Sequence, residues 1–128
     1  MAFSFFLCLA MIFSESLKKS KDFAAVYRSH RSRADRSMVM YVMKNGTDRN
    51  RLGISVSKKV GNSVVRHHLT RLVREAYRLN EEQFLRGYDI VVIARKGSAD
   101  IDFHTVQDSL LKLASASGIR MKAQESGA

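Results

Sequence analysis

Basic side chains recur on one side of a predicted helix that begins at Asn62 or Ser63 and ends near Glu82. With about 100° of rotation per residue, four arginines and one histidine share that side. They are Arg66, His67, Arg71, Arg74 and Arg78. Apolar residues fill the opposite side, so one side packs on a core and the other can meet a partner. Arginine guanidiniums bind phosphate oxygens in pairs, and this pattern therefore favours a polyphosphate partner.

The charge around this helix is unbalanced. Residues 49–78 hold eight Lys and Arg against one acid, Glu75, whereas a solvated helix without a partner usually carries balanced ion pairs. The whole chain has 22 Lys and Arg against 12 Asp and Glu, a net charge of +10. Nucleic acid is the first candidate partner for such a domain, and an anionic membrane surface is the second.

The segment before the helix can also hold phosphate. Lys58 and Lys59 precede Gly61 and the helix N-terminus, where free backbone amides attract anions. The order of these residues differs from that of a Walker loop, so the sequence does not predict nucleotide hydrolysis.

Three aromatic residues could stack on bases. Phe23 and Tyr27 stand four apart in a first helix predicted over Ser16–Arg28, and Tyr41 lies in a strand predicted over Ser37–Lys44. Aromatic residues at such spacings more often belong to a core than to a stacking platform, so both interpretations stay open from the residues alone.

Residue types with catalytic or metal-binding chemistry form no convincing set. His67 and His68 are adjacent, so on a helix they point about 100° apart and do not chelate one metal together. The single cysteine, Cys8, excludes an intrachain disulfide and a cysteine-based zinc site. Three aspartates could be metal ligands, but turn and capping roles explain them better: Asp89, Asp100 and Asp102. We therefore predict a binding protein with no catalytic residues and no metal site of its own.

The elements that position these residues fit a single α/β domain, and the chain of 128 residues has room for only one. In a strand predicted over Arg51–Ser57, Leu52 and its alternate neighbours face a core, while the face of Gly53 is small and polar. The continuous apolar run Asp89–Ala94 indicates a strand covered on both faces. Residues 30–36 are expected to form a loop with a short edge strand. A last helix is expected over Asp102–Ala116, followed by a flexible tail over residues 118–128.

The N-terminal residues Phe3–Phe13 are nearly all apolar. No basic residue precedes this run and no cleavage site follows it, and it is shorter than the roughly 20 residues of a membrane span. We expect Met11 to be the true start, residues 1–10 to be a non-native or disordered extension, and the domain to span residues 11–117. A signal or anchor is the alternative.

The residues 50–66, NRLGISVSKKVGNSVVR, together with Arg71 and the run REAYR over 74–78, resemble the signature of the bacterial ribonuclease P protein subunit. The matching pieces cover about Phe13 to Leu113. The resemblance implies an α/β (α+β) two-layer sandwich with a four-stranded mixed sheet, about three helices and a left-handed βαβ crossover, similar to a domain of ribosomal proteins. This hand runs against the usual right-handed rule, and composition could not have predicted it.

The same resemblance implies an endoribonuclease subunit that assists a catalytic RNA in removing the 5′ leader of precursor tRNA. In that family the RNA holds the Mg²⁺ ions and performs the hydrolysis. The implied partners are the catalytic RNA and precursor tRNA, in the cytoplasm, with no membrane and no protein partner required. The residues implied to bind the catalytic RNA are Lys58, Arg66, His67, Arg71 and Arg74. Those implied to bind the single-stranded leader are Phe23, Tyr27, Tyr41, Ser57 and Lys59.

The helix departs from the family pattern Arg-Asn-Arg-x-x-Lys-Arg at His67, His68 and Thr70. The Arg and the Lys of the family pattern are replaced by His68 and Thr70, so two full positive charges are lost. Because histidine gains charge as the pH falls from about 7.5 to 6, we expect RNA binding to strengthen over this range. Two other functions remain: a structural ribosomal-type RNA-binding protein without a role in cleavage, and a membrane-surface protein. The motif from Lys58 to Arg78 argues against the ribosomal-type protein. The N-terminal run lacks the basic residue and the cleavage site of a signal peptide, which argues against the membrane-surface protein.

Overall fold

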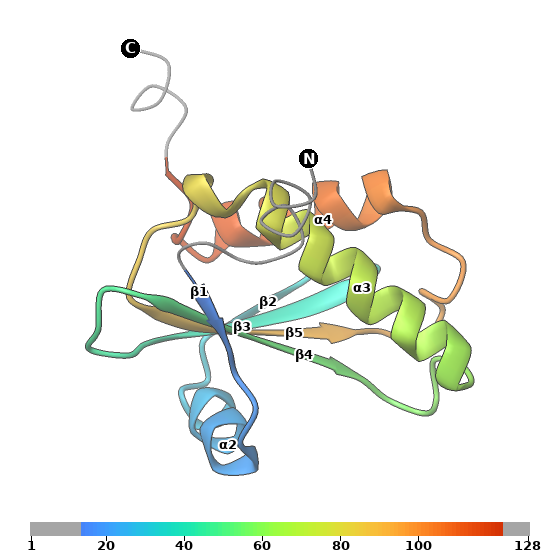
Figure 1. Ribbon diagram of the computed structural model, residues 1–128, viewed down its shortest axis with the longest axis horizontal. Helices are drawn as coiled ribbons and strands as arrows, with labels where there is room; N and C mark the ends of the chain where they lie inside the picture. Colours follow the sequence, from blue (N-terminus) through green and yellow to red (C-terminus); the bar gives the residue numbers. More distant parts are fainter. Residues whose placement is uncertain (1–13, 122–128) are drawn as a thin grey trace, which may run out of the picture.

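The computed structural model describes residues 14–121, which form one five-stranded sheet with helices on both faces (Figure 1). The strands are β1 (Ser14–Ser16), β2 (Ser32–Ala34), β3 (Met38–Lys44), β4 (Asn50–Val56) and β5 (Tyr88–Ala94). The helices are α2 (Ser20–Arg28), α3 (Ser63–Leu79) and α4 (Phe103–Ala116), with a 3-10 turn, η1, at Glu81–Gln83. In the order β1-β4-β5-β3-β2, β4 runs parallel to both of its neighbours and β3 runs antiparallel to both of its own. The mixed α/β class is therefore confirmed.

The main core lies between the sheet and the pair α3 and α4, which cover the same face (Figure 1). Alternate strand residues point into it, among them Met40, Leu52 and Ile90, all almost fully buried. Helix α3 supplies the buried Val73 and Tyr77. It also connects the parallel strands β4 and β5, which makes the βαβ crossover that the resemblance implies, whereas its hand stays a prediction.

The opposite face of the sheet carries α2 (Figure 1). Helix α2 reaches this face because β4 presents Gly53 there, and a Cβ built at Gly53 would lie 2.6 Å from Cζ of Phe23. Val26 and Leu17 complete a small second core over Val91 of β5. The Gly53 face is small, as the sequence predicts, but it is not open at Gly53, because the ring of Phe23 fills the space there.

An ion pair fixes the same helix at its start. Asp89 is fully buried and accepts two hydrogen bonds from Arg51, at 2.8 Å from Nε and 2.6 Å from Nη2. These bonds raise the pKa of the Arg51 guanidinium, which therefore stays charged. Its Nη1 lies 3.4 Å from Asp22 in the first turn of α2. Asn45 donates a further bond to Asp89, so the buried carboxylate is satisfied.

Two predictions near the N-terminus are wrong, the start of the first helix and the number of strands. The first helix begins at Ser20, not Ser16, because residues 14–16 form β1 beside β4 and the Leu17 amide donates to the Leu52 carbonyl. This strand raises the count from the expected four to five. Nothing in the local sequence Ser-Glu-Ser indicates a strand, since the pairing depends on a tertiary neighbour. The expected extension at residues 1–10 lies outside the described residues.

Helix ends are set by local hydrogen bonds. Asn62 caps α3 by accepting from the Val65 amide, and Asp102 caps α4 by accepting from the Thr105 amide, as their sequence positions predict. Helix α3 ends at Leu79, three residues before the predicted Glu82, where the 3-10 turn takes over. Leu79 belongs to the apolar side of the predicted helix, but at the end of α3 its side chain is 55% exposed.

The flexible tail was predicted to begin at residue 118, which is too early, because the chain is still packed on the core there. Ile119 is fully buried, its carbonyl accepts from the Leu85 amide, and Arg120 forms an isolated β-bridge with Phe84. Gly118 turns the chain after α4 with a φ of +77°, a conformation that suits glycine. Residues 118–121 therefore close one end of the main core, in which Ile119 and Phe84 are both buried. The rest of the predicted tail lies outside the described residues.

Asp35 fastens the β2–β3 connection to α4. Its carboxylate accepts from the amides of Ser37 and Met38 and from the hydroxyl of Ser109. Burial alone would raise its pKa, but these bonds, together with the nearby Lys112, outweigh burial and lower it.

We predict that Asp35→Asn lowers the free energy of unfolding at pH 7 by about 1 kcal/mol, measured by chemical denaturation. Because the folded pKa lies below the unfolded one, the ionised form stabilises the fold at neutral pH, and this contribution is lost as the pH falls through the lowered pKa. The difference between the two proteins should therefore shrink near pH 3. Asp108→Asn, at an exposed position on α4, is the control; an equal effect there would contradict the account.

Candidate nucleic-acid interface

Helix α3 presents a basic surface to solvent. Its inner side is held in the core by Leu69, Val73 and Ala76, and this fixes which residues point outward. His67, His68, Arg71 and Arg74 are exposed. Of the predicted RNA-binding residues, His67, Arg71 and Arg74 are therefore accessible to a partner. We refer to these three residues as the α3 surface.

Two other arginines of α3, Arg66 and Arg78, are less exposed than these residues. Arg78 donates to Glu75 in an i,i+3 ion pair, so part of its charge is neutralised within the helix. Arg66 is half-buried and its Nε is buried without a hydrogen-bond partner among the described residues. It borders a hollow of about 300 Å³ that His67 and Thr70 also line. The aliphatic part of Arg66 thus packs against the protein, and its guanidinium lies at the margin of the α3 surface.

The three predicted aromatic residues come together on the other face of the sheet. The ring centroids of Tyr27 and Tyr41 are 5.1 Å apart in an edge-to-face contact, and those of Phe23 and Tyr27 are 6.4 Å apart. All three are half-buried, so each is packed on one side and open on the other. Tyr41 lies in register with Val91, which pairs with Gly53, so the cluster sits across the sheet. We call these rings the aromatic surface.

The Tyr27 hydroxyl stays neutral at physiological pH. Burial raises its pKa, a hydrogen bond with Ser55 partly offsets this rise, and the neighbouring Tyr41 adds to it. A neutral ring with an accessible face suits stacking on an unpaired base.

The connection between β4 and α3 joins the two surfaces. Ser57, Lys58 and Lys59 are all exposed there, in a turn closed by a hydrogen bond from the Val60 amide to the Ser57 carbonyl. Val60 is buried and anchors the turn. The ten predicted site residues thus form an aromatic group, a helical basic group and a short basic link, with the first two on opposite faces of the sheet.

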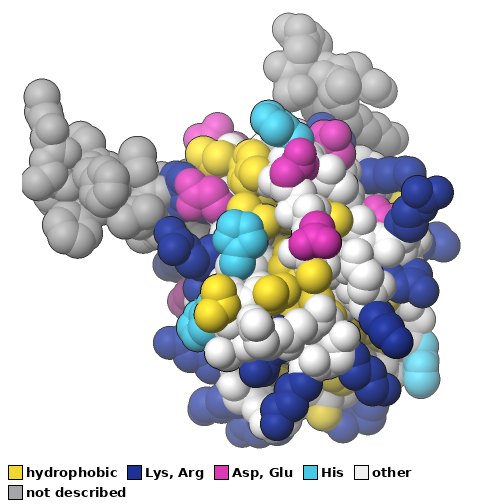
Figure 2. Space-filling model, turned by 90° about the vertical axis from the view of Figure 1, so that its right-hand side faces the viewer, with side chains coloured by type: hydrophobic (Ala, Val, Ile, Leu, Met, Phe, Trp, Pro, Cys, Tyr) yellow, Lys and Arg dark blue, Asp and Glu magenta, His cyan; other side chains and the backbone are white. Residues whose placement is uncertain are grey.

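Other basic residues lie at the same end of the sheet. Arg95 and Lys96 follow β5 as Lys58 and Lys59 follow β4, and the carboxyl ends of parallel neighbours meet. Arg95 binds the β2–β3 connection through its amide and guanidinium, close to the exposed Arg36. Figure 2 shows Lys and Arg side chains crowded over the lower part of this end, with most acidic ones above. The sequence analysis missed these residues, although the shared position after parallel strands was a usable signal.

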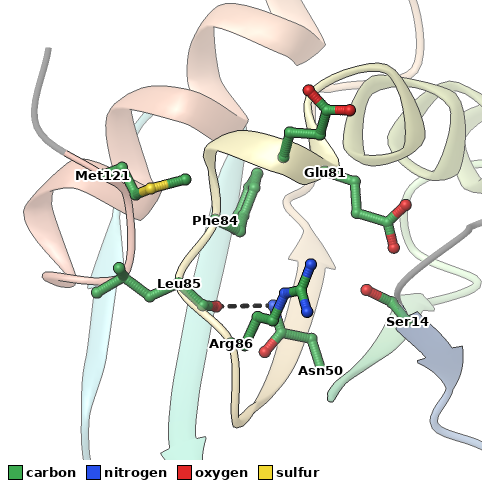
Figure 3. A pocket seen from close by; sticks show the side chains of 8 residues that line it. Ser14, Asn50, Glu81, Phe84, Leu85, Arg86 and Met121 are labelled. Carbon is green, nitrogen blue, oxygen red and sulfur yellow. Dashed lines mark hydrogen bonds between the residues drawn. The ribbon is translucent and has the colours of Figure 1, made fainter. Parts of the chain in front are cut away.

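A separate hollow of about 400 Å³ lies beside Ser14 and Asn50 (Figure 3). Asn50 has a structural role there: it donates to the Leu85 carbonyl and to the Tyr77 hydroxyl, and it accepts from the Tyr88 amide. Tyr77 in turn contacts the Ser14 hydroxyl at 2.7 Å. None of the predicted site residues lines this hollow.

The described residues contain no group of three or more His, Cys, Asp or Glu side chains placed to hold a metal ion. Asp89 is occupied by Arg51, and Asp102 by the cap of α4. No helix within residues 14–121 is long and apolar enough to cross a membrane.

Over most of its length the chain is similar to ribonuclease P proteins. The family model described as Ribonuclease P matches residues 11–117. The ribonuclease P protein component of Lachnoclostridium phytofermentans is 54% identical over 101 residues, which cover 79% of this chain and 87% of that protein. The solved ribonuclease P protein of Staphylococcus aureus is 36% identical, with a TM-score of 0.77 over 84% of this chain and 98% of that one. The corresponding Thermotoga maritima protein is 38% identical, with a TM-score of 0.74 over 80% and 96%.

The contact between Gly53 and Phe23 predicts the effect of a single added methyl group. Gly53→Ala should displace Phe23, lower the free energy of unfolding by about 1–3 kcal/mol and weaken binding of a single-stranded oligoribonucleotide. Denaturation and fluorescence anisotropy measure the two effects. In a Phe23→Leu background the same substitution should cost less stability, because the shorter side chain leaves room. An equal loss in both backgrounds would show that the contact is not the cause.

Proposed function

The chain belongs to the ribonuclease P protein family, and from this premise we propose that its aromatic surface binds the single-stranded 5′ leader of precursor tRNA while its α3 surface binds the catalytic RNA. As a ribonuclease P protein component it acts in tRNA 5′ processing and partners an RNA subunit. The observation that carries the proposal is the separation of the two surfaces on opposite faces of one sheet.

The aromatic surface suits an unpaired strand. Rings that are packed on one side and open on the other stack on bases of any sequence, with about 1–3 kcal/mol for each base. Ser57 and Lys59, at the end of β4, can then hold the phosphates of the same strand. A leader differs in sequence from one precursor to another, and stacking with backbone contacts tolerates such differences.

The α3 surface suits a folded RNA. Arg71 and Arg74 are exposed about one turn apart on α3, and Lys58 is exposed in the turn that precedes the helix. Side chains on a rigid helix keep a fixed spacing, which matches the phosphates of a structured partner better than those of a flexible strand.

We place the hydrolysis and the Mg²⁺ ions on the RNA partner. The described residues contain no group of three or more His, Cys, Asp or Glu side chains placed to hold a metal ion, and we assign no step to a group on the protein. The protein acts by position: it holds the leader on one face and the catalytic RNA on the other, and so reduces the freedom of the scissile bond relative to the RNA. The cytoplasmic location remains a prediction.

Substitutions on the two surfaces should have separate effects. Phe23→Ala with Tyr27→Ala should weaken holoenzyme binding of precursor tRNA roughly 10-fold or more, and leave binding of mature tRNA unchanged. Arg71→Gln with Arg74→Gln should weaken binding of the catalytic RNA and reduce the slope of log K against log salt by about 1–2. Filter binding measures both. If the aromatic variants also weakened catalytic-RNA binding to the same degree, the assignment of separate roles would be wrong.

A further inference from the structure

A polar hollow of about 450 Å³ lies at the edge of the sheet formed by β2, beside the C-terminus of α4. This edge is three strand spacings, about 14 Å, from β4, and so lies away from the α3 surface. The hollow is lined by His30, Arg31, Ser32, Arg33, Ala116, Ser117 and Gly118. Neither the aromatic surface nor the α3 surface contributes a residue to it.

Two arginines are held in place at this hollow. Arg33 pairs with Met40, a core residue, so Arg33 points to the α4 side of the sheet, and Arg31 shares that side. Arg31 donates from Nη2 to the Ser117 carbonyl at 2.9 Å, and Arg33 donates from Nε to the Ala116 carbonyl at 3.2 Å. Each guanidinium has five N–H groups, so these contacts fix the side chains and leave donors for a ligand.

The charge of the hollow stays positive after these contacts. The carbonyl end of a helix carries about half a negative charge, and α4 has no basic residue in its own last turn. Arg31 and Arg33 together supply two positive charges, which more than balance it. The nearby Asp35 carboxylate is engaged by Ser109 and by two backbone amides. An anion at this hollow therefore meets a net attraction.

A buried hydroxyl provides an independent indication of a ligand. Ser117 is only 6% exposed, yet within the described part of the chain its Oγ has no hydrogen-bond partner. An unsatisfied buried polar group costs about 1–3 kcal/mol, so proteins rarely keep one without a reason. Ser117 lines the same hollow as Arg31 and Arg33. A hydroxyl donor beside two guanidiniums matches the oxygens of a phosphate group.

We infer that this hollow binds a phosphate of an RNA backbone and is a third contact of the protein with RNA, in addition to the two surfaces of the proposed function on which the inference rests. Arg28 and Arg36 are also exposed on either side of Arg31 and Arg33 along the chain. Two guanidiniums fixed at one hollow, with further exposed arginines nearby in the chain, suit a polyanionic strand better than a single small anion. The strand comes from the catalytic RNA or from precursor tRNA, two sources with the same chemistry.

The first test removes only the hydroxyl. Ser117→Ala should leave the free energy of unfolding unchanged or slightly raised, because the hydroxyl has no partner in the free protein. The same variant should bind RNA roughly 3- to 10-fold more weakly in filter binding at constant salt. Catalytic RNA alone and precursor tRNA with assembled holoenzyme are the two arms, and the arm that weakens identifies the source of the phosphate.

The second test removes the charges. Arg31→Gln with Arg33→Gln should reduce the salt slope of the same arm by about 1–2, whereas Lys44→Gln with Lys18→Gln, an equal loss of charge at exposed positions elsewhere, should change it less. Unchanged RNA affinity of Ser117→Ala, or equal slopes for the two charge variants, would overturn the inference. Arg71→Gln with Arg74→Gln is run in parallel, because a failure of that variant to weaken binding would instead count against the proposed function.

Discussion

The close approach of α2 to the sheet at Gly53 is the contact on which the arrangement of the aromatic surface depends. Phe23 occupies the space that any larger residue on β4 would fill, and the Arg51 guanidinium ties Asp22 at the start of the helix to the buried Asp89. The apolar contact sets how closely α2 approaches the sheet, and the ion pair holds the first turn of the helix. The open sides of Phe23 and Tyr27 are oriented as a result.

One sheet thereby serves two purposes. Its α3 side is a conventional core, and the helix that covers it carries arginines on the outside. Its other side is only partly covered, and aromatic rings remain accessible there. In the proposed function, the sheet keeps the leader and the catalytic RNA from competing for the same residues. Ser57, Lys58 and Lys59 lie in the connection between β4 and α3.

Much of this could be predicted from the sequence, for reasons that differ between elements. Helix α3 was predictable because its apolar and basic residues separate at helical spacing, and Gly53 because its small neighbours alternate with apolar ones. The strand β1 and the ordered residues 118–121 were not, since both depend on partners distant in the chain, Asn50–Leu52 and Phe84. Glu75 and Arg78 stand three residues apart, a spacing that allows an ion pair on a helix. A helical projection nevertheless shows only where the charges lie, and not which of them are neutralised by a neighbour. The aromatic cluster needed the tertiary structure, because core and platform residues share one sequence pattern.

The most direct test of the account is the cleavage of precursor tRNA by the cognate catalytic RNA at low Mg²⁺, with and without this protein. Substrates with leaders of one, four and eight nucleotides should be compared in single-turnover reactions. The account predicts that the protein stimulates cleavage, and more strongly for the longer leaders, because only these reach the aromatic surface. Absence of stimulation, or stimulation independent of leader length, would contradict the claim that the protein positions the leader for its RNA partner.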